Sequence, residues 1–472
     1  MKQFLKRFAG FSLGPILGAA ISFILFPIFT NSLSVEEYGR SGAFQTLIVQ
    51  IPNFIYIGMD QAFTREYHHQ KDKRSVMQQA MVLPFLLGLL MFVFSIFFAP
   101  QLSEWLFDSS NYSYIVWYAG IWVLATVIER FILLSIRMQE KAIEFSLFSL
   151  LLKMGNFVVS MAMILIGVRD FKAVVYGLIF GQLLADAILF YRYRYLLDFS
   201  HFKLDKQLIQ QMFIFGIPIM IATSLSAALN SVDTIMLREF ASLDDMAFYK
   251  AGSQIGSIIG IMKTAFASFW IPTAYRWYEE NKSIKHYKFI SDGVLLGLTF
   301  VFFGILTLRS PLTYILSSSG EYNEVQYIMG LLAFPHIMYT LSETTTLGIV
   351  FSRKTHYNIF VSLMALIVSV GINLLLTPAY GFKGAALAST AAYVVFYLAR
   401  TYFSSKTGFY FGQKKQVITM IIMILAGLVN MFEIEYSTMY TIILGLLAVS
   451  VQWTTIRTAN DIRLNPSEWD FS

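Results

Sequence analysis

Residues 357–400 read YNIFVSLMALIVSVGINLLLTPAYGFKGAALASTAAYVVFYLAR, and only Lys383 and Arg400 are charged. An α-helix rises about 1.5 Å per residue and the hydrocarbon of a bilayer is about 30 Å thick, so roughly 20 apolar residues cross it. Segments 357–377 and 382–400 both approach this length, and the Pro and Gly between them favour a turn. The stretch therefore predicts two membrane-spanning helices joined by a tight hairpin.

The composition of the whole chain agrees with this prediction. Of 472 residues, 56% are hydrophobic and 14% are charged, and the mean hydropathy is +0.60. Too little polar surface is available to cover a soluble protein of this size. The absence of Cys excludes disulfides, thiolate metal sites and Cys nucleophiles.

Similar apolar segments recur along the chain, so we expect an all-α polytopic membrane protein with about fourteen transmembrane helices. The first follows basic residues but is longer than a signal-peptide core and lacks a cleavage site, so it is interpreted as an uncleaved span. The predicted segments are 9–30, 41–63, 76–99, 114–136, 143–167, 171–191, 209–232, 246–272, 288–308, 325–350, 357–377, 382–400, 416–432 and 438–456.

The distribution of Lys and Arg predicts the orientation. With these spans, 25 of the 35 basic residues lie at one membrane face, six lie at the other and four lie inside spans. Positive residues are retained on the cytoplasmic side, so both termini are expected to be cytoplasmic. This bias accounts for most of the net charge of +6, and no nucleic-acid partner is expected.

The connections between spans are too short for an enzyme domain. The longest outer ones cover 100–113 and 309–324, and no Walker A sequence, dinucleotide loop or HExxH motif is present. His68 and His69 lie together in a basic loop without paired carboxylates, so a metal site is not expected. The sequence therefore favours a protein that is not an enzyme and needs no cofactor.

Two pairs of short motifs indicate an internal repeat. LSVEEY at 33–38 resembles ASLDDM at 241–246, and Phe171-Lys172 resembles Phe382-Lys383 at the tip of a later hairpin. Duplicated bundles are common in transporters. We therefore expect two six-helix lobes, residues 1–200 and 201–405, followed by two additional transmembrane helices and a cytoplasmic tail in 406–472.

Three stretches carry a resemblance to a known family: FTNSLSVEEYG at 29–39, DTIML at 233–237 and LTPAYGFKGAALA at 376–388. Together with the span order, they resemble the Wzx-type polysaccharide flippases of the multidrug/oligosaccharidyl-lipid/polysaccharide exporter superfamily. These motifs look structural, because Gly and Pro set a tight hairpin and small residues let helices pack closely.

The resemblance implies two lobes around a cationic cavity that moves undecaprenyl-pyrophosphate-linked oligosaccharide to the outer leaflet of the bacterial inner membrane. Membrane lipids are then partners, and polysaccharide polymerase machinery is a candidate partner. An ion-coupled drug or metabolite antiporter and a lipid II flippase are the alternatives. Both are weakened by the uncharged first span, because lipid II flippases resemble this topology but carry Arg there, and the multidrug branch often has an acidic residue. A membrane-embedded polymerase is disfavoured by the short loops.

Basic residues inside spans are the candidates for binding the pyrophosphate, because intramembrane charges usually face the protein interior or water. Lys153 and Lys263 are preferred, since each lies about nine or ten residues from a span end, roughly 15 Å deep. Arg130 and Lys250 lie nearer the interfaces, where long side chains also reach water.

Acidic and histidine side chains inside spans are the candidates for ion coupling. Glu343 lies about six residues inside its span near His336, and Asp233 ends the seventh span. Glu129 lies at a depth similar to that of Lys153 on the neighbouring antiparallel helix, so an alternative to substrate binding is a structural ion pair between them. The sequence leaves both roles open.

Overall fold

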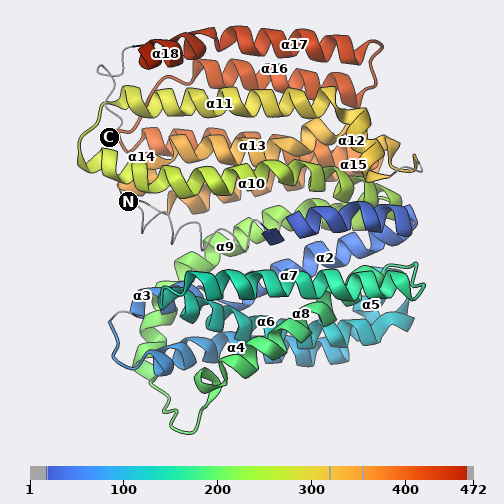
Figure 1. Ribbon diagram of the computed structural model, residues 1–472, viewed down its shortest axis with the longest axis vertical. Coiled ribbons are helices and arrows are strands. Elements are labelled where there is room, and N and C mark those ends of the chain that lie inside the picture. The colour runs from blue at the N-terminus through green and yellow to red at the C-terminus, as the bar shows by residue number, and fades with distance from the viewer. Residues whose placement is uncertain are drawn as a thin grey trace. The chain divides into compact units, whose positions relative to one another are not determined.

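The computed structural model describes residues 17–464, apart from 19, 68, 318–319, 353 and 355, and each regular element in this part is a helix. The helices separate into two compact units, residues 1–234 and 235–472 (Figure 1). The predicted lobe boundaries near residues 200 and 405 remain predictions. Each unit is described here by itself.

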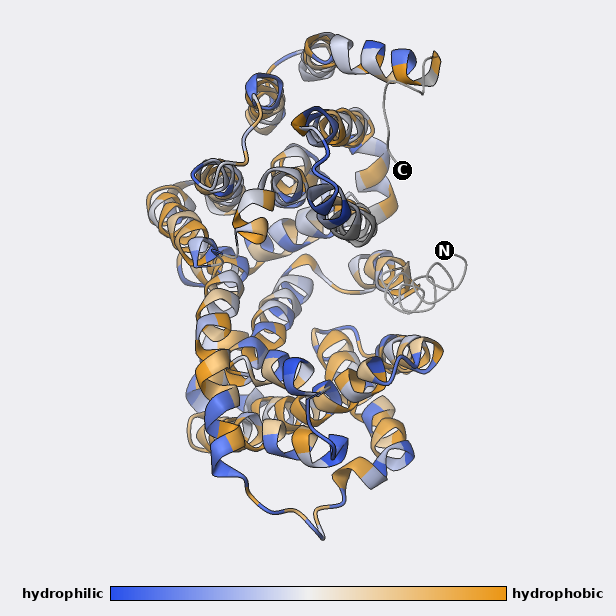
Figure 2. Ribbon diagram, turned by 90° about the vertical axis from the view of Figure 1, so that its left-hand side faces the viewer, coloured by the Kyte–Doolittle hydropathy of each residue, from blue (hydrophilic) through white to orange (hydrophobic). Residues whose placement is uncertain are grey.

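The first unit contains helices that run side by side and are seen nearly end-on in Figure 2. After a first helix, Ala20–Ser32, its helices are α2 (Val35–Ile55), α3 (Met59–Glu66), α4 (Lys73–Phe97), α5 (Ala99–Phe107), α6 (Ser113–Met138), α7 (Ala142–Leu165), α8 (Lys172–Arg192) and most of α9 (Lys206–Phe240).

The second unit begins near the end of α9. Its helices are α10 (Leu243–Glu279), α11 (Ile284–Thr307), α12 (Arg309–Leu316), α13 (Met329–Thr345), α14 (Leu347–Phe351), α15 (Tyr357–Ser405), α16 (Lys414–Met431), α17 (Ser437–Val451) and α18 (Trp453–Leu464). Helix α13 is almost wholly buried, and α10, α11, α15 and α16 pack against it. It is therefore the central helix of this unit.

The helices are those of a multi-pass membrane protein. Within the described chain, eight are long and apolar enough to cross a membrane, or nine if the bent pair at 437–451 and 453–462 forms one span. Large apolar side chains point outward from them, including Leu90, Leu165 and Leu375, which are 69%, 78% and 77% exposed. Such a surface is stable against lipid rather than water. The total of fourteen spans and the cytoplasmic termini remain predictions.

Each predicted segment from 41–63 onward coincides largely with helix, but several are interrupted, and 325–350 and 438–456 each cross a break between helices. Segment 41–63 is interrupted between α2 and α3, where Ile57 and Gly58 have φ of 44° and 72°. Segments 357–377 and 382–400 are joined within α15, where Gly381 turns the backbone at φ 52° and ψ −129°. A positive φ suits Gly because it has no Cβ. Most of the first segment, 9–30, lies outside the described residues.

The repeated motifs make the same contact in each unit. Glu37, in the first turn of α2, accepts a hydrogen bond from the backbone N–H of Phe171 at 2.8 Å. Asp245, in the first turn of α10, accepts one from the N–H of Phe382 at 3.0 Å. In each unit, therefore, the acidic residue of the first repeated motif accepts a hydrogen bond from the Phe-Lys hairpin tip of the second.

Polar contacts attach α16 and the end of α17 to α11. Asp292 of α11 pairs with Lys415 at 2.7 Å and accepts a hydrogen bond from Gln416 at 2.8 Å. Gln452, just after α17, donates to Thr299 at 2.9 Å. These contacts are buried in a largely apolar setting, where an unpaired polar group would be costly. They fix the rotation of the C-terminal helices against α11.

Candidate functional site

Several charged side chains inside the helices gather in a cluster in each unit. The C-terminal cluster, made of Lys263, His336, Tyr339, Glu343 and Arg400, lies on α10, α13 and α15. Two glycines of α10 bring its backbone against α13. A Cβ added to Gly256 would lie 2.5 Å from the carbonyl oxygen of Leu332, and one added to Gly260 would lie 3.2 Å from Nδ1 of His336. This close crossing sets Lys263, three residues after Gly260, beside the polar face of α13.

Lys263 is half-buried, and its ammonium lies over the ring of Tyr339, with Nζ 3.6 Å from the ring centroid. The guanidinium of Arg400 lies 5.2 Å from the same centroid and 5.3 Å from that of Phe396. A cation over an aromatic face is stabilised by the negative face of the ring, most strongly where water is scarce. Tyr339 therefore holds two cations near one another.

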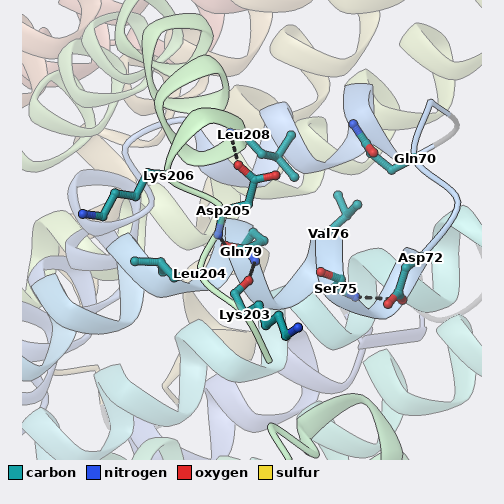
Figure 3. A pocket seen from close by; sticks show the side chains of 10 residues that line it. All are labelled: Gln70, Asp72, Ser75, Val76, Gln79, Lys203, Leu204, Asp205, Lys206 and Leu208. Carbon is teal, nitrogen blue, oxygen red and sulfur yellow. Dashed lines mark hydrogen bonds between the residues drawn. The ribbon is translucent and has the colours of Figure 1, made fainter. Parts of the chain in front are cut away.

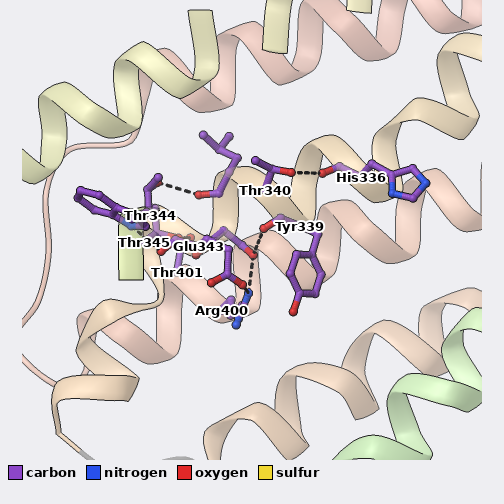
Figure 4. A network of polar contacts seen from close by, with 11 residues as sticks. His336, Tyr339, Thr340, Glu343, Thr344, Thr345, Arg400 and Thr401 are labelled. Carbon is purple, nitrogen blue, oxygen red and sulfur yellow. Dashed lines mark hydrogen bonds and ion pairs between the residues drawn. The ribbon is translucent and has the colours of Figure 1, made fainter. Parts of the chain in front are cut away.

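Glu343 forms an ion pair with Arg400, whose Nη1 lies 2.8 Å from Oε1 of Glu343 and 2.8 Å from Oγ of Ser342 (Figure 4). The two charged side chains are only 12% and 11% exposed. Arg400 was assigned from the sequence to the cytoplasmic end of a predicted span. In the structure α15 continues to Ser405, so Arg400 lies within the helix. A buried carboxylate needs a cationic partner, and that requirement is the signal that could have found Arg400.

The structure thus brings together three residues selected from the sequence, Lys263, His336 and Glu343. The ring of His336 lies against α10, and the residue is half-buried. The two cations of the cluster face a single carboxylate, and that carboxylate is paired with Arg400. The cluster carries one positive charge in excess, and Lys263 supplies it.

The N-terminal cluster consists of Asp60, Glu129, Arg130, Lys153 and Asp186. Arg130 of α6 pairs with Asp60 of α3, with Nη2 2.7 Å from Oδ2, and Asp60 is 6% exposed. Arg130 also lies over the ring of Tyr56, 5.6 Å from its centroid. An arginine selected from the sequence as a substrate contact is therefore held in an internal ion pair.

Lys153 of α7 is exposed at the surface of its unit. A Cβ added to Gly18 would lie 2.9 Å from Cγ of Lys153, so the alkyl chain of Lys153 packs against Gly18. Its charge acts on Glu129, but no nitrogen–oxygen contact within 4.0 Å joins these two described residues. Oε2 of Glu129 instead accepts a hydrogen bond from Gln182 at 2.6 Å. The tight ion pair between Lys153 and Glu129 that was considered from the sequence is therefore absent from this structure.

The other two selected residues lie apart from these groupings along the chain. Lys250 is half-buried on α10, thirteen positions before Lys263, and Asp233 is 5% exposed near the end of α9. Both have interaction partners. Asp186 of α8 was not selected from the sequence, although it is 1% exposed.

A cavity of about 620 Å³ lies outside both clusters, between the start of α4 and the segment that precedes α9 (Figure 3). Gln79 bridges the two, accepting from the N–H of Asp205 at 3.1 Å and donating to the carbonyl of Lys203 at 2.6 Å. The lining of the cavity also includes Asp72 and Ser75. None of the residues selected from the sequence lines this cavity, which is built by the loop that α4 anchors.

Comparison with known sequences places this chain among proteins of polysaccharide synthesis. A family described as polysaccharide biosynthesis protein matches residues 4–277, more than half of the chain. The capsular polysaccharide biosynthesis protein CapF of Staphylococcus aureus is 21% identical over 207 residues, which are 43% of this chain and 52% of CapF. The chain thus matches this curated relative over about half of that relative's length.

Solved structures share the fold. The lipid II flippase MurJ in an inward closed conformation superposes with a TM-score of 0.72 at 14% identity, covering 96% of this chain and 98% of MurJ. An inward-facing multidrug resistance MATE family transporter of the MOP superfamily gives a TM-score of 0.62 at 13% identity, covering 85% and 99%. At these identities the likeness establishes the fold alone.

Proposed function

Because this chain belongs to the polysaccharide biosynthesis protein family, we propose that it is a flippase for lipid-linked oligosaccharide. Its substrate is an undecaprenyl-pyrophosphate-linked repeat unit, which it carries from the cytoplasmic to the outer leaflet of the bacterial inner membrane. In this role the protein makes and breaks no covalent bond. It supplies a polar path through hydrocarbon for a charged and hydroxylated head group.

The observation that carries this proposal is the excess cation at Lys263. Charged groups inside a membrane protein are costly and usually serve the path of a substrate or ion. Glu343 already has Arg400 as its partner, so the ammonium of Lys263 can attract an anion without breaking that pair. At an effective dielectric constant of about 20, two unit charges 4 Å apart attract by about 4 kcal/mol. Desolvation of both groups reduces this gain, but the positive charge of Lys263 still favours an anion over a cation.

Lys153 is a second candidate cation, although its charge also acts on Glu129. It lies in the middle of α7, is exposed at the surface of its unit and has no carboxylate within 4.0 Å among the described residues. A pyrophosphate carries more than one negative charge, and each unit offers it one lysine, Lys153 in the first unit and Lys263 in the second. Arg130 is a weaker candidate, because Asp60 already neutralises it.

The test is complementation of surface-polysaccharide export in a strain that lacks the chain, with protein abundance measured beside export. We expect Lys263→Gln to reduce export about tenfold, equivalent to about 1.4 kcal/mol, at near-normal abundance. Lys263→Arg should recover part of the activity, because the attraction depends on charge sign. The matched control is Lys414→Gln, which removes the same charge from an exposed position at the start of α16.

Three outcomes would contradict the proposal. Full export by the double variant Lys153→Gln, Lys263→Gln would exclude both lysines from the path. Rescue of a strain depleted of its lipid II flippase, without any rescue of polysaccharide export, would instead assign lipid II as the substrate. Drug efflux with neither rescue would favour the antiporter alternative.

A further inference from the structure

Asp186 is a buried acid without a donor. Its side chain lies within α8 and the residue is 1% exposed. Neither carboxylate oxygen accepts a hydrogen bond from a described donor. A buried carboxylate in this state is costly if it is ionised, because nothing replaces the water that it has lost.

The neighbouring polar groups do not donate a hydrogen bond to Asp186. Gln182, one helical turn earlier, directs its amide Nε2 at Oε2 of Glu129, 2.6 Å away, and at the hydroxyl of Thr126, 3.1 Å away. Glu129 is itself close enough to Asp186 to interact with it. Two ionised carboxylates that are close together repel each other, and a hydrogen bond between them requires that one carries a proton.

The described side chains on the surrounding helices carry one more negative charge than positive charge. Asp60, Glu129 and Asp186 provide three carboxylates, and Arg130 and Lys153 provide two cations. Arg130 is taken by Asp60, and the charge of Lys153 acts on Glu129. Among the described residues, the phenol of Tyr56 also lies beside the cluster, and Glu144, farther along, is hydrogen-bonded by Tyr193. One negative charge therefore remains, and one proton would cancel it.

Helix α8, which carries Asp186, packs tightly against α7 and is hydrogen-bonded through Gln182 to Glu129 of α6. A Cβ added to Gly155 of α7 would lie 2.2 Å from the carbonyl oxygen of Gly181 on α8. This backbone contact lies next to Gln182 and two residues after Lys153. The hydrogen bond from Gln182, one turn before Asp186, holds Asp186 near Glu129, and the residue is shielded from solvent. The excess negative charge therefore has to be balanced by a bound cation.

We propose that the Glu129–Asp186 pair is a proton-binding site, which holds one exchangeable proton between the two carboxyl groups. In the cycle of the proposed flippase, release of this proton leaves the cluster negative and its uptake restores neutrality, so transport is coupled to a proton. Glu343 is less suited to this role because Arg400 already stabilises its ionised form. Only the coupling rests on the proposed function; proton binding does not.

Infrared spectroscopy of the purified protein tests proton binding without substrate. A protonated carboxyl gives a C=O band that shifts in D2O. We expect the wild type at neutral pH to show such a band, and Asp186→Asn and Glu129→Gln each to abolish it. In either variant the two remaining carboxylates match the two cations, so no proton is required. Asp186→Asn should also fold well, since Asn resembles a protonated Asp in shape.

The matched control is Asp292→Asn, which alters an equally buried acid that Lys415 and Gln416 already satisfy. This variant should keep the band. A band that persists in both Asp186→Asn and Glu129→Gln would overturn the proposal. So would a wild type that lacks the band but is stabilised against heat by Na⁺ only when Asp186 is present, because the site would then hold a metal cation.

Coupling is tested by export in cells treated with a protonophore and in proteoliposomes with an imposed pH gradient. Wild-type transport should rise with the gradient, whereas Asp186→Asn transport should not respond to it. A band that behaves as expected, with transport that ignores the gradient, would retain the proton site and refute the coupling. Loss of the lipid-linked substrate assignment would leave the infrared result unchanged.

Discussion

The charge balance of the C-terminal cluster predicts a specific pattern of non-additive stability. Arg400→Gln removes the hydrogen bonds that Glu343 and Ser342 accept, each 2.8 Å long. Hydrogen bonds to charged groups contribute about 1.5–3 kcal/mol. Lys263 is close enough to act on Glu343 and can partly neutralise it, so we expect a loss near the lower end, about 2 kcal/mol. Lys263→Gln alone should cost less than about 1 kcal/mol, the scale of a cation–π contact.

The double variant is the decisive one. With both Lys263 and Arg400 changed to Gln, Glu343 is a buried carboxylate without a cation in the cluster, and breaking a buried pair in this way costs about 3–5 kcal/mol. The double loss should therefore exceed the sum of the single losses. Adding Glu343→Gln should recover most of it, because no stranded charge then remains. The same reasoning predicts that Lys263→Gln lowers transport with little effect on folding.

The measurement is the free energy of unfolding in mixed micelles of increasing SDS content, with a matched Lys414→Gln variant as the control. Single losses that add within about 0.5 kcal/mol would show that the two cations do not share Glu343. If Lys263→Gln proved as damaging as Arg400→Gln, Lys263 would be a structural partner of Glu343, and its assignment as the excess cation would fail.

Three further predictions follow from the hairpin contacts and the basic residues. Gly381→Ala should lower the amount of folded protein in the membrane, because the added Cβ would lie 2.1 Å from Oδ1 of Asp245; Gly293→Ala, with nothing within 4 Å, should not. Asp245→Ala should destabilise the protein by about 1–3 kcal/mol by removing the acceptor of the Phe382 N–H, measured by SDS unfolding, whereas Asp245→Asn should cost less because it keeps an acceptor. Single cysteines introduced into this Cys-free chain at Lys71, Lys203, Lys285 or Lys414 should be labelled only from the cytoplasm. Labelling of any of them from outside intact cells would require a new topology.

Several features of this protein follow from sequence alone. Apolar runs of about 20 residues specify helices in lipid, because a helix satisfies its backbone hydrogen bonds internally. The repeated acidic and Phe-Lys motifs indicated which segments are equivalent, and each acidic motif does hold a Phe-Lys tip. The family resemblance came from the same stretches. All these signals are local, so a few adjacent residues are sufficient to carry them.

The partners of the buried charges were decided only by tertiary structure. Arg400 neutralises Glu343, 57 positions away, Arg130 neutralises Asp60, 70 positions away, and Asp186 is left without a donor. One residue turns a helix by about 100°, so small differences in helix rotation change which side chains meet. That rotation is set by close backbone crossings, as at Gly256 and Gly155, which hydropathy and charge counts do not reveal.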